Sequence, residues 1–156
     1  HPDYTGLKFL NTLLGGYFGS RLMKNLREDK GYTYGVHSAV SSFDLSGFMV
    51  ISTDVGRQNA DKAVAEIFSE LKRLQSEPAA DEEMEVVRKY MMGEILRMFD
   101  GPFAIADSYR SVHEFGLNFD YYGRMADTIR SVTPDEIMSL ANTYCRPEDM
   151  FEIKAG

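Results

Sequence analysis

The sequence predicts an α+β domain in which helices pack against a largely antiparallel sheet. The chain of 156 residues opens with helical spacing, becomes extended near Tyr32 and returns to helical spacing from about Asn59. Helices grouped on either side of one hairpin are typical of this class, whereas a parallel α/β sheet alternates strands with helices. The length suits one domain with a sizeable core.

Two helices are expected before the hairpin. Apolar residues recur at helical spacing from Leu7 to Leu14, and Gly15-Gly16 ends that helix. Ser20 is the expected N-cap of a second helix, because its hydroxyl suits the unpaired amides of a helix start. Gly31 stops this helix. Its inward side chains are expected to be Leu22, Met23 and Leu26.

A β-hairpin is expected next. Tyr32 to Phe43 is rich in aromatic, β-branched and small residues, and the extended pattern resumes from Phe48 to Thr53. Asp44-Leu45-Ser46-Gly47 between them is a turn signal. One hairpin makes a small sheet, so a further strand is expected upstream of His1 or from another source. Met150 to Ile153 is expected to form a closing strand.

The remaining residues predict a run of helices, separated by proline and glycine. Expected ranges are Asn59 to Pro78, Asp81 to Phe99, Phe103 to Glu114, Tyr121 to Arg130 and Thr133 to Tyr144. The last begins with Thr-Pro-Asp-Glu, which predicts a capping box with proline in the first turn. Residues expected to face inward from the second of these helices are Met84, Val87, Met91, Met92, Ile95, Leu96 and Phe99.

Composition excludes several classes of function. The net charge is −7, and the one local group of cations, around Arg27, is interrupted by Glu28 and Asp29. A nucleic-acid binder usually carries a basic stripe, so no nucleic-acid partner is expected. No apolar run approaches the roughly 18 residues of a membrane span. Cys145, the single cysteine, cannot form an intrachain disulfide, and we expect an inert thiol rather than a nucleophile.

No catalytic zinc site is expected in this chain. Catalytic zinc usually takes three protein ligands and a water. The histidines are His1, His37 and His113, and none forms a helical pair with another. His113-Glu114 continues as Phe-Gly-Leu, so neither H-E-x-x-H nor H-x-x-E-H is present.

The segment from Leu13 to Tyr34, LLGGYFGSRLMKNLREDKGYTY, resembles the M16 family of metallopeptidases (insulinase, pitrilysin and mitochondrial processing peptidase). The family pattern is roughly L-G-G-x-x-x-S-R-L-x-x-x-L-R-E-x-x-G-x-x-Y, and this segment meets nearly every fixed position. The resemblance implies the LuxS/MPP-like metallohydrolase fold. It also implies that residues 1–156 form one C-terminal, non-zinc ("inactive") domain of a longer peptidase, without the first strand of the fold.

The resemblance further implies a partner. Such peptidases consist of two homologous halves around a chamber, and the N-terminal half carries zinc on an H-x-x-E-H motif. That half, in the same chain or in another subunit, is therefore the expected partner, together with a peptide substrate. A second copy in a homodimer is a further candidate partner. No cofactor is expected in this domain itself. The compartment, cytoplasmic or periplasmic, stays open.

Arg27 and Tyr34 are the candidate site residues that the resemblance implies, because the non-zinc half supplies an arginine and a tyrosine seven residues apart. A tyrosine hydroxyl can stabilise the oxyanion of peptide hydrolysis, and an arginine fork can hold a substrate carbonyl or carboxylate. Tyr32, where an aliphatic residue is commoner, either lines the chamber or packs. The alternative function is a non-catalytic peptide-binding or scaffold domain. The absence of a metal motif agrees with this function equally well.

Overall fold

The structure is a computed structural model that describes residues 1–43 and 45–156. It has the expected mixture of helices and a two-stranded antiparallel sheet. The elements in chain order are α1 (Tyr4–Asn11), η1 (Thr12–Gly16), η2 (Met23–Asp29), β1 (Thr33–Ser42), β2 (Gly47–Val55), η3 (Arg57–Asn59), α2 (Ala60–Ser76), α3 (Asp81–Arg97), α4 (Pro102–Glu114), α5 (Asp120–Ser131), α6 (Pro134–Tyr144) and η4 (Pro147–Asp149). Segments η1 and η2 are π-helical, and η3 and η4 are single 3₁₀ turns.

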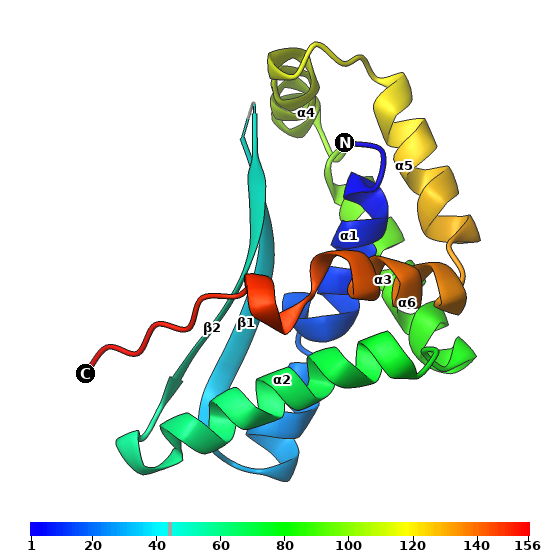
Figure 1. Ribbon diagram of the computed structural model, residues 1–156. Coiled ribbons are helices and arrows are strands. Elements are labelled where there is room, and N and C mark those ends of the chain that lie inside the picture. The colour runs from blue at the N-terminus through cyan, green and yellow to red at the C-terminus, as the bar shows by residue number, and fades with distance from the viewer. Residues whose placement is uncertain (44) are drawn as a thin grey trace.

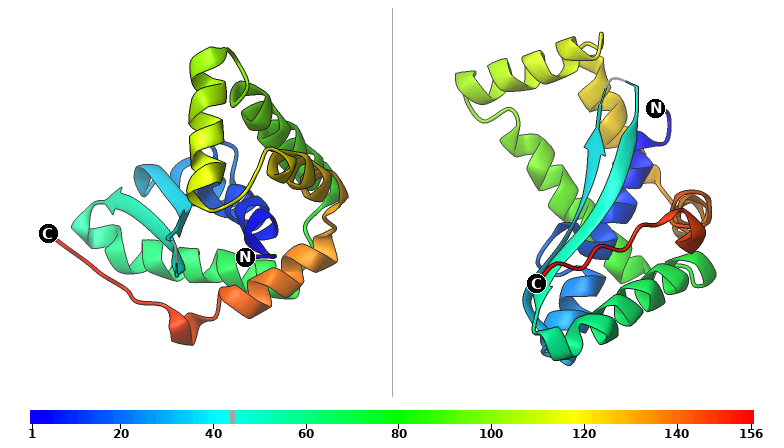
Figure 2. Two further views of the ribbon diagram at one scale, coloured as in Figure 1. Left: turned by 90° about the horizontal axis from the view of Figure 1, so that it is seen from above. Right: turned by 60° about the vertical axis from the view of Figure 1, so that its left-hand side comes forward.

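The helices gather on one side of the hairpin (Figure 1). Strand β1 lies against α1, η1 and η2, while α1 also contacts α5 and α6, and α2 contacts α6. Helix α4 extends away from the rest of the helical layer, as the view from above shows (Figure 2). No helix within residues 1–43 and 45–156 is long and apolar enough to span a membrane.

The hairpin pairs β1 with β2 in antiparallel register from Ser42↔Gly47 to Thr33↔Val55. Side chains alternate between the two faces of a strand, and this alternation buries Val36 and Ser38 of β1 against the helices. The predicted turn includes Asp44, which lies outside the described residues. On either side of it, the amide of Phe43 donates to the Ser46 carbonyl at 2.8 Å.

The core follows the predicted apolar faces closely. Leu22, Met23 and Leu26 of the second helical segment are buried. In α3, the residues Met84, Val87, Met91 and Ile95 are buried as expected. Leu96 is an exception, because 72% of it is exposed, so the prediction that it faces inward is wrong. It lies one residue beyond Ile95, and a helix turns about 100° per residue, which carries Leu96 off the buried face.

A reciprocal pair of hydrogen bonds joins the first helical segment to β1. The Asn11 side-chain amide donates to the Ser38 carbonyl, and the Ser38 hydroxyl donates to the Asn11 carbonyl, both at 3.2 Å. Gly15 lets the backbones approach, because a Cβ at this position would lie 2.6 Å from Ser38 Oγ. This contact fixes where the glycine-rich loop after η1 begins relative to the sheet.

Two further predictions concern helix ends. The capping box at α6 is confirmed: the Glu136 amide donates to Thr133 Oγ1 at 3.2 Å, and Glu136 Oε2 accepts from the Thr133 amide at 2.7 Å. The prediction that the Ser20 side chain caps the second helix is wrong. The Ser20 hydroxyl is buried without a hydrogen-bond partner among the described residues, and only its carbonyl joins the helix, accepting from Lys24.

The closing strand expected at Met150 to Ile153 does not form in this structure. Residues 150–156 are an irregular tail in which Phe151 and Ile153 are 95% and 89% exposed. The tail is attached to α2 through the ion pair of Lys154 with Asp61 at 2.6 Å. A strand needs a neighbouring backbone to bond with. No such neighbour lies beside the tail in the part of the chain that the structure describes.

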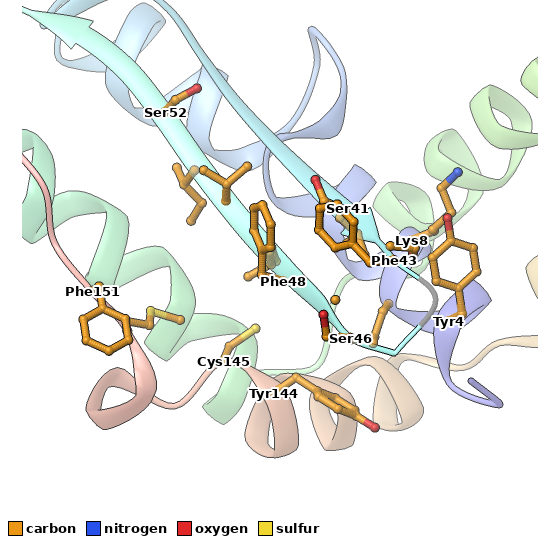
Figure 3. Close-up of a pocket in the computed structure, with 18 of the residues that line it drawn as sticks. Tyr4, Lys8, Ser41, Phe43, Ser46, Phe48, Ser52, Tyr144, Cys145 and Phe151 are labelled. Atoms are coloured by element: carbon orange, nitrogen blue, oxygen red, sulfur yellow. The ribbon is translucent and has the colours of Figure 1, made fainter.

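A large hollow of about 2390 Å³ lies between β2, the helices and this tail (Figure 3). Phe48 and Ser52 of β2 line one wall, while Cys145 and Phe151 line the opposite side. The hollow includes none of the three candidate site residues. The outer edge of β2 has no partner strand among the described residues. The further strand expected upstream of His1 or from another source stays a prediction.

Candidate functional site

The candidate site is built on the junction between η2 and β1. Arg27 lies in the last turn of η2, and Tyr34 is the second residue of β1. Gly31 has φ +63°, a left-handed conformation that glycine adopts without strain. Around it, the Tyr32 amide donates to the Leu26 carbonyl at 2.8 Å, closing the helix end. The chain therefore passes from helix to strand through a defined turn.

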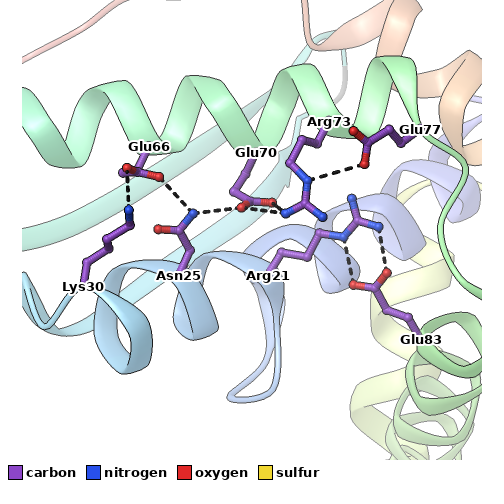
Figure 4. Close-up of polar contacts among 8 residues, drawn as sticks. All are labelled: Arg21, Asn25, Lys30, Glu66, Glu70, Arg73, Glu77 and Glu83. Atoms are coloured by element: carbon purple, nitrogen blue, oxygen red, sulfur yellow. Dashed lines mark hydrogen bonds and ion pairs between the residues drawn. The ribbon is translucent and has the colours of Figure 1, made fainter.

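A pair of polar contacts fixes the start of η2 against the rest of the domain (Figure 4). Arg21 donates from Nε and Nη2 to the two carboxylate oxygens of Glu83 in α3, at 2.8 and 2.7 Å. The hydrogen bonding of Arg21 to the Glu83 carboxylate raises the pKa of Arg21 against the opposing effect of burial. Glu83 is 62 residues away from Arg21 in the sequence, so the pair joins two distant segments of the chain.

The middle and the end of η2 are attached to α2. The Asn25 amide donates to Glu66 at 3.1 Å and to Glu70 at 2.8 Å, and Lys30 forms an ion pair with Glu66 at 3.2 Å. The Asn25 hydrogen bond is the main cause that lowers the pKa of Glu66, and Lys30 acts in the same direction. Glu70 is buried and also accepts from Arg73 at 3.0 Å. These contacts hold the helix that carries Arg27 (Figure 4).

A β-bulge sets the direction of Tyr34. Thr33 pairs with Val55 and Val36 pairs with Thr53, so Tyr34 and Gly35 together lie opposite the single residue between those partners. The Thr53 hydroxyl lies 3.0 Å from the Thr33 hydroxyl and 2.9 Å from the Gly35 carbonyl. The Gly35 amide donates to the Thr33 hydroxyl at 3.1 Å. A bulge redirects the side chains beside it, and the hydroxyls of Thr33 and Thr53 hold this bulge in place.

Tyr34 and Arg27 differ in their surroundings within the domain. Tyr34 is 100% exposed. The Arg27 guanidinium lies over the ring of Phe18, 4.6 Å from its centroid. Within residues 1–43 and 45–156 it has no hydrogen bond or ion pair, so its N–H groups are available to a ligand. Tyr32, by contrast, is partly buried and packs against the core, which favours the packing interpretation for this residue.

A shallow hollow of about 480 Å³ adjoins the candidate site. Its lining includes Phe18 from the glycine-rich loop, Gly35 and His37 from β1, and Asp54 from β2. The hollow lies between the loop that holds Phe18 and the bulge that holds Tyr34.

Groups capable of other chemistry lie elsewhere. Cys145 is fully buried, and burial raises the pKa of its thiol to about 11, so the thiol is a poor nucleophile at neutral pH. His113 packs its ring near Tyr109, with centroids 5.6 Å apart. Among the described residues, no three His, Cys, Asp or Glu side chains converge as metal ligands. The residues described in this domain therefore do not fit a zinc site. The family resemblance places the zinc in the partner half.

The family was established by comparison with known proteins. Residues 1–91, more than half of the chain, match the model of the peptidase M16 inactive domain. The chain belongs to this family. The match contains the whole segment from Leu13 to Tyr34, and with it both Arg27 and Tyr34.

Two relatives from Bacillus subtilis (strain 168) are much longer than this chain. The protein named "Uncharacterized zinc protease YmxG" is 32% identical over 96 residues, which are 62% of this chain and 24% of that protein. "Probable inactive metalloprotease YmfF" is 22% identical over 105 residues, covering 67% of this chain and 24% of that protein. The chain thus spans about a quarter of these relatives.

A solved structure confirms the fold. The peptidase M16 inactive domain from Pseudomonas fluorescens superposes with a TM-score of 0.79 at 22% identity, over 92% of this chain and 34% of that one. The predicted α+β class and the resemblance to the M16 inactive domain are both confirmed.

Sequence reasoning missed two residues at this site. Phe18 falls at a variable position of the family pattern, and only its exposed place in a glycine-rich loop marks it. Thr53 looked like an ordinary strand residue, because a bulge is a property of strand pairing and leaves no spacing signal in one strand.

Proposed function

We propose that this domain is the substrate-chamber half of a zinc-dependent metalloendopeptidase of the insulinase type. In this proposal Arg27 binds the peptide and Tyr34 both binds it and stabilises the oxyanion. The observation that carries the proposal is the pair itself. A match to the M16 inactive domain contains a fully exposed tyrosine and an arginine that contacts an aromatic ring, both next to a defined helix–strand junction.

The chemistry assigned to Tyr34 follows from peptide hydrolysis. Negative charge grows on the carbonyl oxygen as the bond is attacked, and a phenol O–H that donates to this oxygen stabilises the transition state. A fully exposed tyrosine loses apolar burial within its own domain, so its position favours contact with another body. The bulge fixed by Thr33 and Thr53 limits its freedom before the substrate arrives.

The chemistry assigned to Arg27 is recognition. Its planar fork can donate two parallel hydrogen bonds to a carboxylate, or bind backbone carbonyls, and so fix the register of the peptide. Its free N–H groups support this role, as does the anchoring of η2 through Asn25 and Arg21.

The zinc half is part of the proposal. The relative named a zinc protease is about four times longer than the matched region, which supports a partner half in the same chain or in a separate subunit. Zinc in that half would supply the activated water. We extend the proposal to the domain organisation, with residues 1–156 as one domain of such an assembly. A homodimer is a further possible arrangement of it.

The test begins with the assembled protein. We expect an H-x-x-E-H motif in the same gene product or in a co-purifying subunit, and zinc-dependent cleavage of a fluorogenic peptide. Tyr34→Phe should lower kcat by the equivalent of roughly 1 to 4 kcal/mol of barrier with little change in peptide affinity. Tyr109→Phe, at another exposed tyrosine, is the matched control. An unchanged kcat in Tyr34→Phe would remove Tyr34 from the mechanism.

The second candidate function is a peptide-binding or scaffold domain without catalysis. It is favoured by the relative whose name calls it inactive. If the assembly binds peptides but carries no H-x-x-E-H motif and cleaves nothing with zinc, this second function replaces the first.

A further inference from the structure

Phe18 is an exposed aromatic residue in contact with the candidate site. Phe18 is 65% exposed and belongs to the loop between two helical segments rather than to the core. The Arg27 guanidinium carbon lies 4.6 Å from the ring centroid, within the range of a cation–π contact. The Arg27 guanidinium thus has an aromatic partner, and within residues 1–43 and 45–156 it makes no hydrogen bond or ion pair.

The loop that carries Phe18 is held firmly. Tyr17 is extended, with φ −150° and ψ 170°, and its ring lies 5.0 Å from the ring of Tyr90 in α3. The Ser20 amide donates to the Tyr17 carbonyl at 3.1 Å, which closes the loop. Gly19 packs under the Tyr17 ring, where a Cβ would lie 2.8 Å from a ring carbon. The position of Phe18 is therefore set by contacts other than the one with Arg27.

Stacking on a fixed ring changes what an arginine can do. A free arginine side chain loses rotamer freedom when a ligand immobilises it. A ring under the guanidinium plane restricts those rotamers beforehand but leaves the in-plane N–H groups unused. Preorganisation of this kind strengthens binding by lowering the entropic cost.

We infer that Phe18 is a positioning residue that orients Arg27 for the peptide. Phe18 acts through the guanidinium and makes no contact of its own with the peptide. The inference rests on the proposed function, because it assigns to Phe18 a share in the peptide binding of Arg27.

The test measures the affinity of the assembled full-length protein for a fluorescent peptide. The scissile bond of this peptide is reduced, so that its affinity can be measured whether or not the assembly cleaves peptides. Phe18→Leu should weaken binding by about two- to fivefold, the worth of an exposed cation–π contact. Phe18→Tyr keeps the ring and should bind normally. Thermal unfolding should be unchanged in both variants, since the side chain is largely exposed. Normal affinity in Phe18→Leu overturns the inference.

A double-mutant cycle separates positioning from direct contact. In an Arg27→Ala background, Phe18→Leu should weaken binding no further. A further loss of the same two- to fivefold would mean that the ring contacts the peptide itself, and the positioning role would be wrong. The Arg27→Ala single variant tests the proposed function separately. If Arg27→Ala binds the peptide normally, the recognition role of Arg27 is wrong. If Arg27→Ala binds weakly while Phe18→Leu binds normally, only the role of Phe18 is wrong.

Discussion

The guanidinium of Arg21 and the carboxylate of Glu83 form two parallel hydrogen bonds, at 2.8 and 2.7 Å, that connect the helix before the candidate site to α3. The Arg21 side chain is only 10% exposed. A charge in such a place is costly without its partner. The pair therefore governs both stability and the placement of the helix that carries Arg27.

Glu83→Gln should lower the free energy of unfolding by about 3 kcal/mol, because it leaves the Arg21 charge buried and only partly paired. Chemical denaturation measures this loss. Arg130→Ala, which removes an exposed pair with Asp127, is the matched control and should change stability by less than about 0.5 kcal/mol. A loss in Glu83→Gln no larger than in the control would contradict the assigned role.

Arg27→Ala should raise the KM of the assembled peptidase roughly tenfold, the worth of one charge-assisted hydrogen bond, with a smaller effect on kcat. Arg27→Lys keeps the charge but loses the planar fork, so it should fall between the wild type and alanine. Arg110→Ala, at an exposed arginine of α4, serves as the control. An alanine variant with a normal KM would show that Arg27 does not hold the substrate.

Thr53→Val should lower kcat about three- to tenfold while peptide affinity stays near normal, because the bulge that aims Tyr34 loses two hydroxyl contacts. Stability should fall by about 1 kcal/mol. Steady-state kinetics and denaturation measure the two effects. Thr143→Ala is the comparison, since that hydroxyl bonds only within its own helix. A Thr53→Val variant with unchanged kcat would show that the bulge orients Tyr34 without these hydroxyls.

Cys145 should make stability depend on alkaline pH. Burial raises the pKa of its thiol from 9.0 to about 11 in the folded state. Between these values the folded protein keeps a proton that the unfolded chain releases, so stability falls as pH rises. The stability that the neutral thiol contributes, on the order of 2 kcal/mol, is complete below about pH 9 and is lost towards pH 11. Denaturation of wild type and Cys145→Ala across this range should show the difference, and parallel pH curves would contradict it.

Several local features were predictable because they depend on neighbouring residues. The capping box from Thr133 to Glu136 is encoded in four consecutive residues, and the hairpin is indicated by two stretches rich in aromatic and β-branched residues on either side of a turn signal. The Ser20 cap failed because the tertiary packing buried the hydroxyl away from the helix amides. Leu96 failed because an apolar residue can lie outside the buried face of its helix.

The candidate site divides in the same way. Arg27 and Tyr34 could be proposed from a motif, since their spacing and surroundings are written along one segment. Phe18 and Thr53 could not, because their roles depend on which side chains meet across a turn or a strand pair.

The sequence by itself predicted most of the helical and extended segments, the M16 resemblance and the two candidate site residues, because periodicity, capping and motif spacing are local properties of the chain. The tertiary structure alone decided that Glu83 pairs with Arg21, that Phe18 lies beneath Arg27, and that a bulge turns Tyr34 outward. Those facts depend on contacts between distant segments, and the packing of the whole domain sets such contacts.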